Sequence, residues 1–269
     1  MKIGIIGLGV VGGAVKHGLE RIGQNVAGYD IQYPETSIED VLNTELCFVC
    51  VPTPSNPNGS CDISIVEKVV RELAEYQYQG LVVIKSTVEP GTTDQFAKIY
   101  NLKLAFCPEF LREKATYTDF VENHDLCAIG VYNDQNYKLI KQAHGSLPQK
   151  FCKLTPLEAE LTKYFSNVFN ALKIIFANEF YEVCKSIGAD YTKIKNAMVH
   201  RNTIADAYLD CNENFRGFGG NCLIKDTLAF STLVKELGID MKLFELIKED
   251  LDQELGYCED MFLDDEIKE

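Results

Sequence analysis

One cysteine in this sequence stands in a setting that suits chemistry. Cys222 lies in the segment Gly217–Asp226, which reads Gly-Phe-Gly-Gly-Asn-Cys-Leu-Ile-Lys-Asp. A glycine cluster permits unusual backbone angles and close approach, so it suits a loop that wraps a phosphate or exposes a thiol. The cation of Lys225 follows closely, and a nearby cation favours the thiolate, which is the nucleophilic form of cysteine. Spacing alone leaves open the alternative that Cys222 is a packing residue, as most cysteines are.

A second pair of polar residues has helical spacing. Lys163 and Asn167 are four residues apart in a segment without Gly or Pro, so they share one helix face. A cation and an amide donor on one face can stabilise a developing oxyanion. A solvated polar face, which is the commoner origin of such a pair, also explains the pattern.

The elements that must position these residues fall into two parts. Up to residue 154, short apolar runs alternate with helical patterns, which predicts a Rossmann-type, doubly wound parallel sheet. The following segment predicts a smaller all-helical domain with one long helix, beginning at Leu157 after Pro156 and ending near Ser186, before Gly188. We therefore expect an α/β fold with a Rossmann domain over 1–154, a helical domain over 155–252 and an acidic tail over 253–269. The strands are expected at 2–7, 25–30, 46–51, 81–84, 104–106, 126–131 and 150–153, and the helices at 11–22, 63–75, 92–99, 157–186, 191–199, 225–237 and 241–251.

The first strand leads into a glycine motif. Gly7, Gly9 and Gly12 form a G-x-G-x-x-G sequence before a predicted helix, and Asp30 ends the next predicted strand. In dinucleotide-binding domains these glycines allow a tight turn, a close approach to pyrophosphate and close helix packing. A carboxylate at Asp30 binds ribose hydroxyls and repels a 2′-phosphate, so the motif predicts NAD rather than NADP.

Two further loops, 51–55 and 86–93, follow predicted strands, and ligands bind at the carboxyl ends of parallel strands. Turn chemistry alone also explains their Pro and Gly residues. Together with the glycine motif, they give this set of expected cofactor-binding residues: Gly7, Gly9, Val10, Val11, Gly12, Asp30, Val51, Thr53, Pro54, Ser86 and Thr87.

Composition excludes several classes of function. The formal net charge of −14 argues against a nucleic-acid partner. No apolar run is long enough to span a membrane, and the first residues do not resemble a signal peptide, so we expect a cytoplasmic protein. The ten cysteines are then expected to be reduced. Cys47 and Cys50 have C-x-x-C spacing but should point to opposite faces of a strand, and no second pair completes a zinc site, so no metal is expected.

The motifs taken together resemble the UDP-glucose/GDP-mannose dehydrogenase family, from Met1 to about Leu237. The resemblance rests on the glycine motif with Asp30, the segments 51–55, 86–93, 108–113 and 159–164, the residues Asn167, Asn178 and Glu179, and the segment 217–226. It implies an NAD-dependent four-electron oxidation of a nucleotide sugar, with UDP-glucose as the expected substrate, to the uronic acid. It also implies a homodimer formed through the helical domain.

The resemblance assigns roles by position. Cys222 would capture the aldehyde as a thiohemiacetal, which a second hydride transfer would convert to a thioester. Lys163 and Asn167 would hold the substrate oxygen, Asp226 and Thr87 would position or activate water, and Glu109 would assist hydrolysis of the thioester. Glu113 and Lys225, with Thr53 and Thr87, would lie along the cofactor. The expected substrate-binding residues are Glu109, Phe110, Leu111, Lys163, Asn167, Phe218, Gly219, Gly220 and Cys222.

The sequence departs from the family pattern in several places. In the family, a carboxyl-terminal domain binds the nucleotide of the substrate. The motifs that carry the resemblance include none from that domain. The usual Arg-Ile-Gly stretch is replaced by residues 205–208, Lys114 replaces a glycine, and Leu-Ile-Lys follows Cys222 instead of apolar-Pro-Lys. These departures concern the binding and specificity of the substrate, while every proposed catalytic group is present. Two alternatives stay open: a two-electron enzyme like the β-hydroxyacid dehydrogenases, which needs no cysteine, and a degenerate nucleotide-binding protein without catalysis.

Overall fold

Seven strands form one sheet in the first part of the chain, in the order β2-β1-β3-β4-β5-β6-β7. The computed structural model describes residues 1–112, 115–217 and 221–244. The strands are β1 (Lys2–Ile6), β2 (Asn25–Tyr29), β3 (Leu46–Val49), β4 (Leu81–Ile84), β5 (Lys103–Phe106), β6 (Leu126–Gly130) and β7 (Lys150–Leu154). The helices between them are α1 (Val10–Arg21), α2 (Ile38–Leu42), α3 (Ser64–Glu75), α4 (Thr92–Ile99), α5 (Thr116–Val121) and α6 (Asp134–His144).

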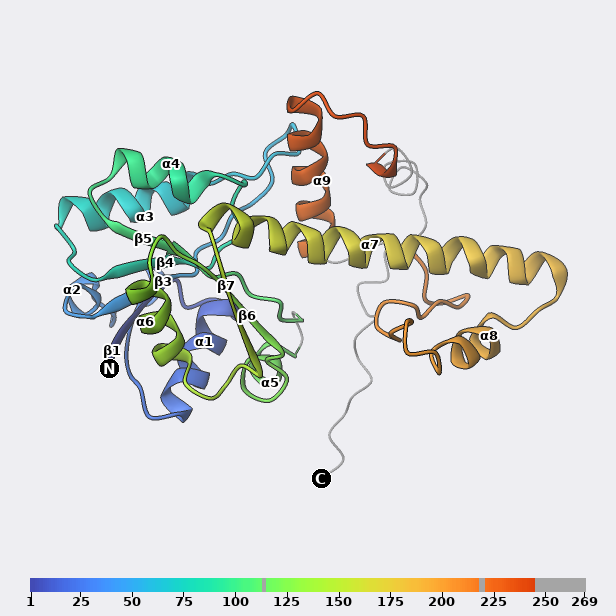
Figure 1. Ribbon diagram of the computed structural model, residues 1–269, viewed down its shortest axis with the longest axis horizontal. Helices are drawn as coiled ribbons and strands as arrows, with labels where there is room; N and C mark the ends of the chain where they lie inside the picture. Colours follow the sequence, from blue (N-terminus) through green and yellow to red (C-terminus); the bar gives the residue numbers. More distant parts are fainter. Residues whose placement is uncertain (113–114, 218–220, 245–269) are drawn as a thin grey trace. The chain divides into compact units, whose positions relative to one another are not determined.

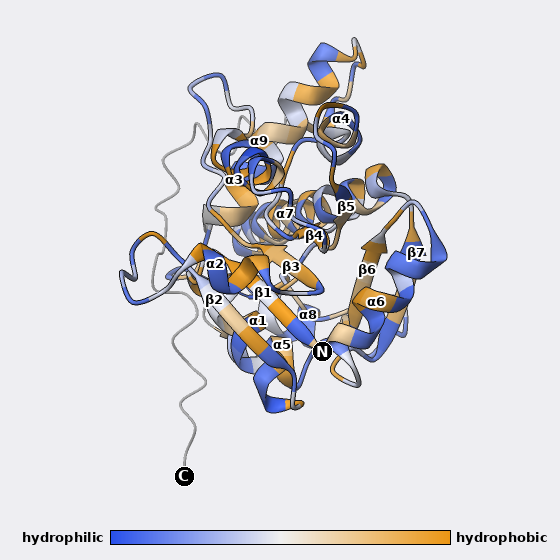
Figure 2. Ribbon diagram, turned by 90° about the vertical axis from the view of Figure 1, so that its left-hand side faces the viewer, coloured by the Kyte–Doolittle hydropathy of each residue, from blue (hydrophilic) through white to orange (hydrophobic). Residues whose placement is uncertain are grey.

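Two apolar layers hold helices on both faces of this sheet. On one face, buried residues of α1, α5 and α6, such as Val15, Phe120 and Ile140, pack against the strands. On the other face, residues of α2, α3 and α4, such as Val70 and Phe96, do the same. Figure 1 shows the helices on the two sides, and in Figure 2 strand β3 is mostly orange, the hydrophobic end of the scale. Strands buried on both faces read as continuous apolar runs, which is why the sequence revealed them.

The direction of the last two strands differs from the parallel sheet that the sequence predicts. β1 to β5 pair in parallel, but β5 pairs with β6 antiparallel, and β7 is parallel to β6. The connection between β5 and β6 contains the six-residue helix α5, which packs beside α1.

The chain forms two compact units. The first contains Met1–Pro57 and Cys61–Lys163, and the second contains Asn58–Ser60 and the chain from Tyr164 onward. The division therefore falls inside the 32-residue helix α7 (Pro156–Ile187). The expected domain boundary at residue 154 stays a prediction.

Helices make up most of the regular structure in the second unit, which also contains α8 (Tyr191–Met198) and α9 (Asn221–Glu236). Buried Val168, Ala171 and Ile175 of α7 form an apolar cluster with Val234 of α9. A second cluster joins α7 to Tyr191, whose hydroxyl donates to the Leu209 carbonyl at 2.7 Å. No helix in the described ranges is both long and apolar enough to cross a membrane.

The predicted elements are largely confirmed, with one correction that matters for the site. The long helix begins at Pro156 and ends at Ile187, close to the expected ends. α9, however, begins at Asn221 and not at Lys225, so Cys222 lies in the first turn of a helix rather than in the loop that was expected. No Gly or Pro lies between Asn221 and Leu237, so nothing there prevents the early start. The expected helix at 241–251 lies mostly outside the described residues.

A buried carboxylate of α7 supports the start of α4 within the first unit. No side chain of its own caps α4, whose N-cap Gly91 has φ of +99°. Glu160 accepts hydrogen bonds from the backbone N–H groups of Gly91 at 2.5 Å and Thr93 at 2.8 Å, and from the Thr93 hydroxyl at 2.6 Å. Burial raises the pKa of Glu160, and these hydrogen bonds oppose that effect.

We expect Glu160→Ala to lower the free energy of unfolding by about 3 kcal/mol, because it leaves two helix N–H groups buried without an acceptor. Glu160→Gln, which keeps one acceptor oxygen, should cost less. Urea unfolding followed by circular dichroism measures both. Glu179→Ala, at an exposed position of the same helix, is the control. Equal stability of the Glu160→Ala and Glu179→Ala proteins would contradict this account.

Candidate functional site

The glycine motif forms a tight turn between β1 and α1. Gly7 has φ of +89°, and a Cβ there would lie 2.6 Å from the Cys50 carbonyl oxygen. A Cβ on Gly12 would lie 1.8 Å from the Gly7 carbonyl oxygen, so only glycine lets α1 start this close to β1. A Cβ on Gly9 would meet nothing within 4 Å. The turn is therefore closed around Gly7 and Gly12 and open at Gly9, where a pyrophosphate has room to approach.

The start of α1 is suited to an anion. Gly9 is its N-cap, and no side chain caps the helix, so its first N–H groups are left for a ligand. Asp30 directly follows β2, and its Oδ2 accepts a hydrogen bond from the Leu8 N–H at 2.7 Å. This bond holds the expected ribose-binding carboxylate against the glycine turn. Val10 and Val11 begin the helix, and Val10 is exposed.

The loops that follow β3 and β4 are joined to each other. The Ser86 hydroxyl donates to the Val51 carbonyl at 2.6 Å, and Ser86 and Thr53 are both buried. The thiol of Cys61 donates to the Thr87 carbonyl at 3.5 Å, while Pro54 is exposed. The strand order reverses at β1, which lies between β2 and β3, and open α/β sheets bind ligands outside the carboxyl ends at such a point. The residues present fit a dinucleotide here.

Lys163 and Glu109 form a buried ion pair in the first unit. The Lys163 Nζ lies 2.8 Å from Glu109 Oε1 and 2.8 Å from the Glu109 carbonyl oxygen. The other carboxylate oxygen accepts from the Leu111 N–H at 2.6 Å, and Nζ lies 6.0 Å from the centre of the Phe110 ring. Burial acts to raise the pKa of Glu109, but the Lys163 charge and the hydrogen bonds outweigh it, so the pKa is lowered. Glu109 is therefore a carboxylate at neutral pH.

Asp226 is the centre of a polar group in the second unit. Its Oδ2 accepts from the Asn167 amide at 2.6 Å, and its Oδ1 pairs with the Lys225 Nζ at 2.6 Å. Asp226 is only 1% exposed, so these two partners replace the water it would otherwise bind. The bond between Asn167 and Asp226 connects α7 to α9.

Cys222 lies one helical turn before Asp226, in the first turn of α9, and is exposed. Residues four apart share a helix face, so the thiol and the carboxylate lie on the same side of α9. The amino-terminal end of a helix favours an anion such as a thiolate. The structure thus gives the thiol the access that a nucleophile needs.

Asn178 has a positioning role that the sequence did not assign. It is buried, and its Oδ1 accepts from the Gly217 N–H at 3.3 Å and from the Cys211 thiol at 3.2 Å. Gly217 has φ of +90°, a backbone conformation that glycine adopts without strain, and Asn178 holds its N–H in place. Arg216 forms an ion pair with Glu182. The predicted site residues Glu113, Phe218, Gly219 and Gly220 lie outside the described residues.

We expect Lys163→Met to lower the free energy of unfolding by about 4 kcal/mol at pH 7, because Glu109 would keep a buried charge without its cation. The lowered pKa of Glu109 means that the pair stabilises the native state above the usual glutamate pKa and loses this effect as the pH falls through the lowered value. In Lys163→Met, burial acts on Glu109 without the opposing Lys163 charge, so the carboxyl should take up a proton at a higher pH than in the wild type, and the loss should shrink between pH 7 and pH 4. Urea unfolding at both pH values tests this, and the double variant with Glu109→Gln, which removes both charges, should recover stability. A loss independent of pH would contradict the explanation.

Comparison with known proteins supports the resemblance over most of the chain. The model of the UDP-glucose/GDP-mannose dehydrogenase family, NAD binding domain, matches residues 33–147, and that of the family's central domain matches residues 157–250. The chain is 34% identical over 218 residues to UDP-glucose 6-dehydrogenase of Rickettsia bellii, covering 78% of this chain and 49% of the relative. It is 27% identical to GDP-mannose 6-dehydrogenase of Pseudomonas aeruginosa, covering 89% of this chain and 66% of the relative.

A solved structure agrees with both matches. The structure of a UDP-glucose dehydrogenase from Pyrobaculum islandicum superposes with a TM-score of 0.83 at 30% identity, covering 93% of this chain and 68% of that one. The chain spans about half the length of its Rickettsia relative, 49%. Two consecutive domain matches and this superposition lead to one conclusion: the chain belongs to the UDP-glucose/GDP-mannose dehydrogenase family.

Proposed function

We propose that this protein catalyses the NAD-dependent, four-electron oxidation of a nucleotide sugar, with UDP-glucose as the expected substrate, to the uronic acid. The observation that carries the proposal is the set of polar partners around the residues that match the family pattern. Lys163 has a buried carboxylate partner in Glu109, and Asn167 has one in Asp226. Cys222 is exposed one helical turn before Asp226. A cysteine that only fills space in the core would be buried. A solvated polar helix face would not give Lys163 and Asn167 these carboxylate partners.

The first oxidation removes a hydride and a proton from the primary alcohol of the sugar. NAD, when bound, would supply the hydride acceptor. The glycine turn and Asp30, which come just before the residues 33–147 that match the family's NAD binding domain, would hold it. The hydroxyl proton leaves to water as the aldehyde forms. We assign to Lys163 and Asn167 the stabilisation of the negative charge on the substrate oxygen, because an ammonium and an amide both donate hydrogen bonds.

The second oxidation uses the thiol. The sulfur of Cys222 adds to the aldehyde carbon, and the carbonyl oxygen becomes the hydroxyl of a thiohemiacetal. Loss of a second hydride, for which a second NAD would be the acceptor, and of the hydroxyl proton to water gives a thioester. A covalent adduct divides a difficult oxidation into two easier steps and retains the aldehyde. The position of Cys222 at the start of α9 supports this role.

Hydrolysis of the thioester needs a base and a positioned water. Water adds its oxygen to the thioester carbon, the sulfur leaves to restore the Cys222 thiol, and the uronic acid is released. We assign the assisting role to Glu109, whose lowered pKa leaves it as a carboxylate at neutral pH and which lies beside the Lys163 ammonium group. We assign the positioning of the water to Asp226 and Thr87.

We expect Cys222→Ala to abolish production of the uronic acid while binding of NAD is retained. Wild-type protein should form two NADH for each molecule of product, measured by absorbance and by mass spectrometry of the sugar nucleotide. UDP-, GDP- and free sugars form the substrate panel. Cys152→Ser, at a half-buried position on β7, is the matched control and should retain turnover.

Other outcomes identify the alternatives. Turnover that survives both Cys222→Ala and thiol alkylation, with one NADH for each product, would point to a two-electron enzyme. Binding of NAD without oxidation of any nucleotide sugar would point to a nucleotide-binding protein without catalysis. Either result would overturn the proposal. The expected cytoplasmic location stays a prediction.

We further propose that the protein forms a homodimer through α7. Large apolar side chains are exposed along this helix at intervals of three and four residues, which places them in one stripe. Their exposed fractions run from 36% at Leu172 to 76% at Phe165. A stripe of this size on a soluble protein favours a partner surface, and a second copy offers the same stripe in return. The stripe consists of Phe165, Phe169, Leu172, Phe176, Phe180, Val183 and Ile187.

We expect Phe176→Asp to convert the dimer to a monomer, because a charge in the middle of the stripe would have to be buried without a partner. Sedimentation velocity at several protein concentrations measures the state. Asn170→Asp places the same charge on α7 outside the stripe and should leave the dimer intact. A monomeric wild-type protein, or a dimer that tolerates Phe176→Asp, would contradict the proposal.

A further inference from the structure

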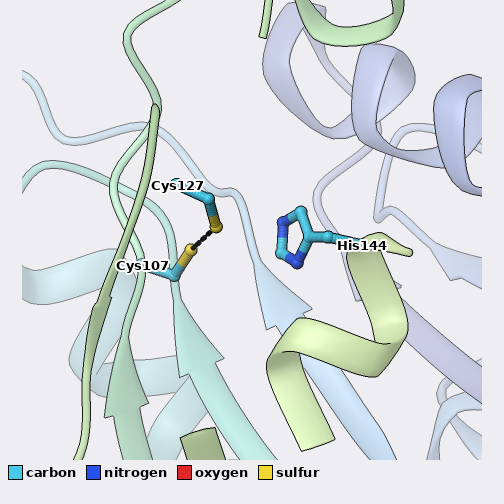
Figure 3. A group of neighbouring side chains, drawn as sticks. All are labelled: Cys107, Cys127 and His144. Atoms are coloured by element: carbon cyan, nitrogen blue, oxygen red, sulfur yellow. Dashed lines mark hydrogen bonds between the residues drawn. The ribbon is translucent and has the colours of Figure 1, made fainter. Parts of the chain in front are cut away.

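Three potential metal ligands meet in the core of the first unit, separate from the residues assigned to catalysis. Cys107 follows β5, Cys127 lies on β6, and His144 is the last residue of α6. Figure 3 shows the imidazole facing the two sulfurs. The sulfurs are 3.7 Å apart, and one ligand atom from each of the three residues lies within 4.8 Å of the others. The exposed fractions of these residues are 0%, 1% and 0%, so the site is closed to bulk solvent.

The imidazole of His144 has an unused nitrogen. Its Nδ1 lies 2.9 Å from the Ile140 carbonyl oxygen and can only donate to it, which leaves the lone pair on Nε2. That Nε2 is buried and has no hydrogen-bond partner. A buried polar atom without a partner is costly, and native proteins rarely contain one without a reason. Metal-binding histidines commonly donate their other N–H to a backbone carbonyl, as His144 does.

A buried cation lies beside one of the two sulfurs. The Lys85 Nζ is buried and lies 3.7 Å from the Cys107 sulfur and 3.1 Å from the Cys107 carbonyl oxygen. The hydrogen bond with Cys127 holds the pKa of Cys107 well below its usual range, helped by the Lys85 charge and opposed by burial. The same hydrogen bond raises the pKa of Cys127 well above its usual range. The site therefore brings two sulfurs and the buried Lys85 cation together.

We propose that Cys107, Cys127 and His144 form a binding site for one thiophilic metal ion of single positive charge, of the copper(I) class. An ion about 2.3 Å from each sulfur would make an S–metal–S angle of about 107° at the observed sulfur separation of 3.7 Å, so the cysteines need not move. Thiolate and imidazole ligands are those that copper(I) and zinc(II) prefer.

The charge of the site favours the monovalent ion. Binding forms two metal–sulfur bonds and one metal–nitrogen bond, and the protons of the thiols leave to solvent, with no change of oxidation state. Two metal-bound thiolates, the Lys85 cation and a monovalent ion are together neutral, whereas a divalent ion would leave one buried positive charge, which is expensive. Three ligands in a closed site also leave zinc(II) without its usual fourth ligand.

The test is a competition for copper(I) under anaerobic conditions between the full-length protein and a chromophoric copper(I) chelator. Because the site is buried, the mixture is followed until it no longer changes. We expect about one copper(I) per chain at the tightest site, with X-ray absorption showing two sulfur ligands and one nitrogen ligand, and a rise in the midpoint of thermal unfolding. Cys127→Ala should weaken the binding at least about a hundredfold, because losing a ligand costs more than losing a supporting contact.

Matched variants separate this site from other thiols. Cys47→Ala makes the same change at a fully buried cysteine of the other core layer, and Cys222→Ala removes the exposed thiol. Both should retain the tight copper(I) equivalent. Retention of that equivalent in Cys127→Ala, its loss in Cys222→Ala, or a wild-type protein that binds zinc(II) but not copper(I) would overturn the proposal. Since Cys127→Ala could perturb folding, X-ray absorption of the wild-type protein provides an independent test: a spectrum without both sulfur and nitrogen ligands rejects the site.

Discussion

The parallel register of the first five strands is the constraint on which the cofactor site depends. Parallel pairing places the carboxyl ends of β1, β3, β4 and β5 at one edge of the sheet. The glycine turn, the loops after β3 and β4, and the segment with Glu109 all leave from that edge. If the pairing of the strands slipped by one residue, each side chain would move to the opposite face of the sheet. The residues from which the loops leave the sheet would then change their orientation as well. The buried apolar residues on both faces prevent such a slip, so they also fix the groups that bind and react.

Buried charges within each unit share one arrangement, in which a carboxylate or thiolate receives several donors at once. Glu160 receives three hydrogen bonds, and Glu109 receives a cation and a backbone N–H. Asp226 receives a cation and an amide. Several donors offset the loss of hydration that burial imposes, which a single surface contact would not achieve. Such groups are held in one orientation, and this is useful where a reaction depends on position.

Much of the fold could be predicted from local sequence because its signals are local. Apolar runs indicated the strands, and the absence of Gly and Pro indicated the long helix α7. The reversed direction of β6 and β7 could not be predicted, because an apolar run marks a strand without showing which way the strand runs in the sheet. The early start of α9 was missed because the glycines before it indicated a loop. At the site, the types and the order of the residues could be used for prediction, but their hydrogen-bond partners could not be predicted. The bond between Asn167 and Asp226, for example, joins residues 59 positions apart. The meeting of Cys107, Cys127 and His144 likewise has no short-range signature.

The distribution of thiols determines how the folded protein meets electrophiles. Among the described cysteines, Cys222 alone is exposed, while the others are buried or half-buried. Reaction with a dissolved alkylating agent or peroxide requires both a thiolate and access to solvent. Cys107 has the first without the second, since the sheet and its helices enclose it. The fold thus separates reactivity from accessibility, and a mild reagent would modify the proposed nucleophile long before it reached the sulfurs of the core.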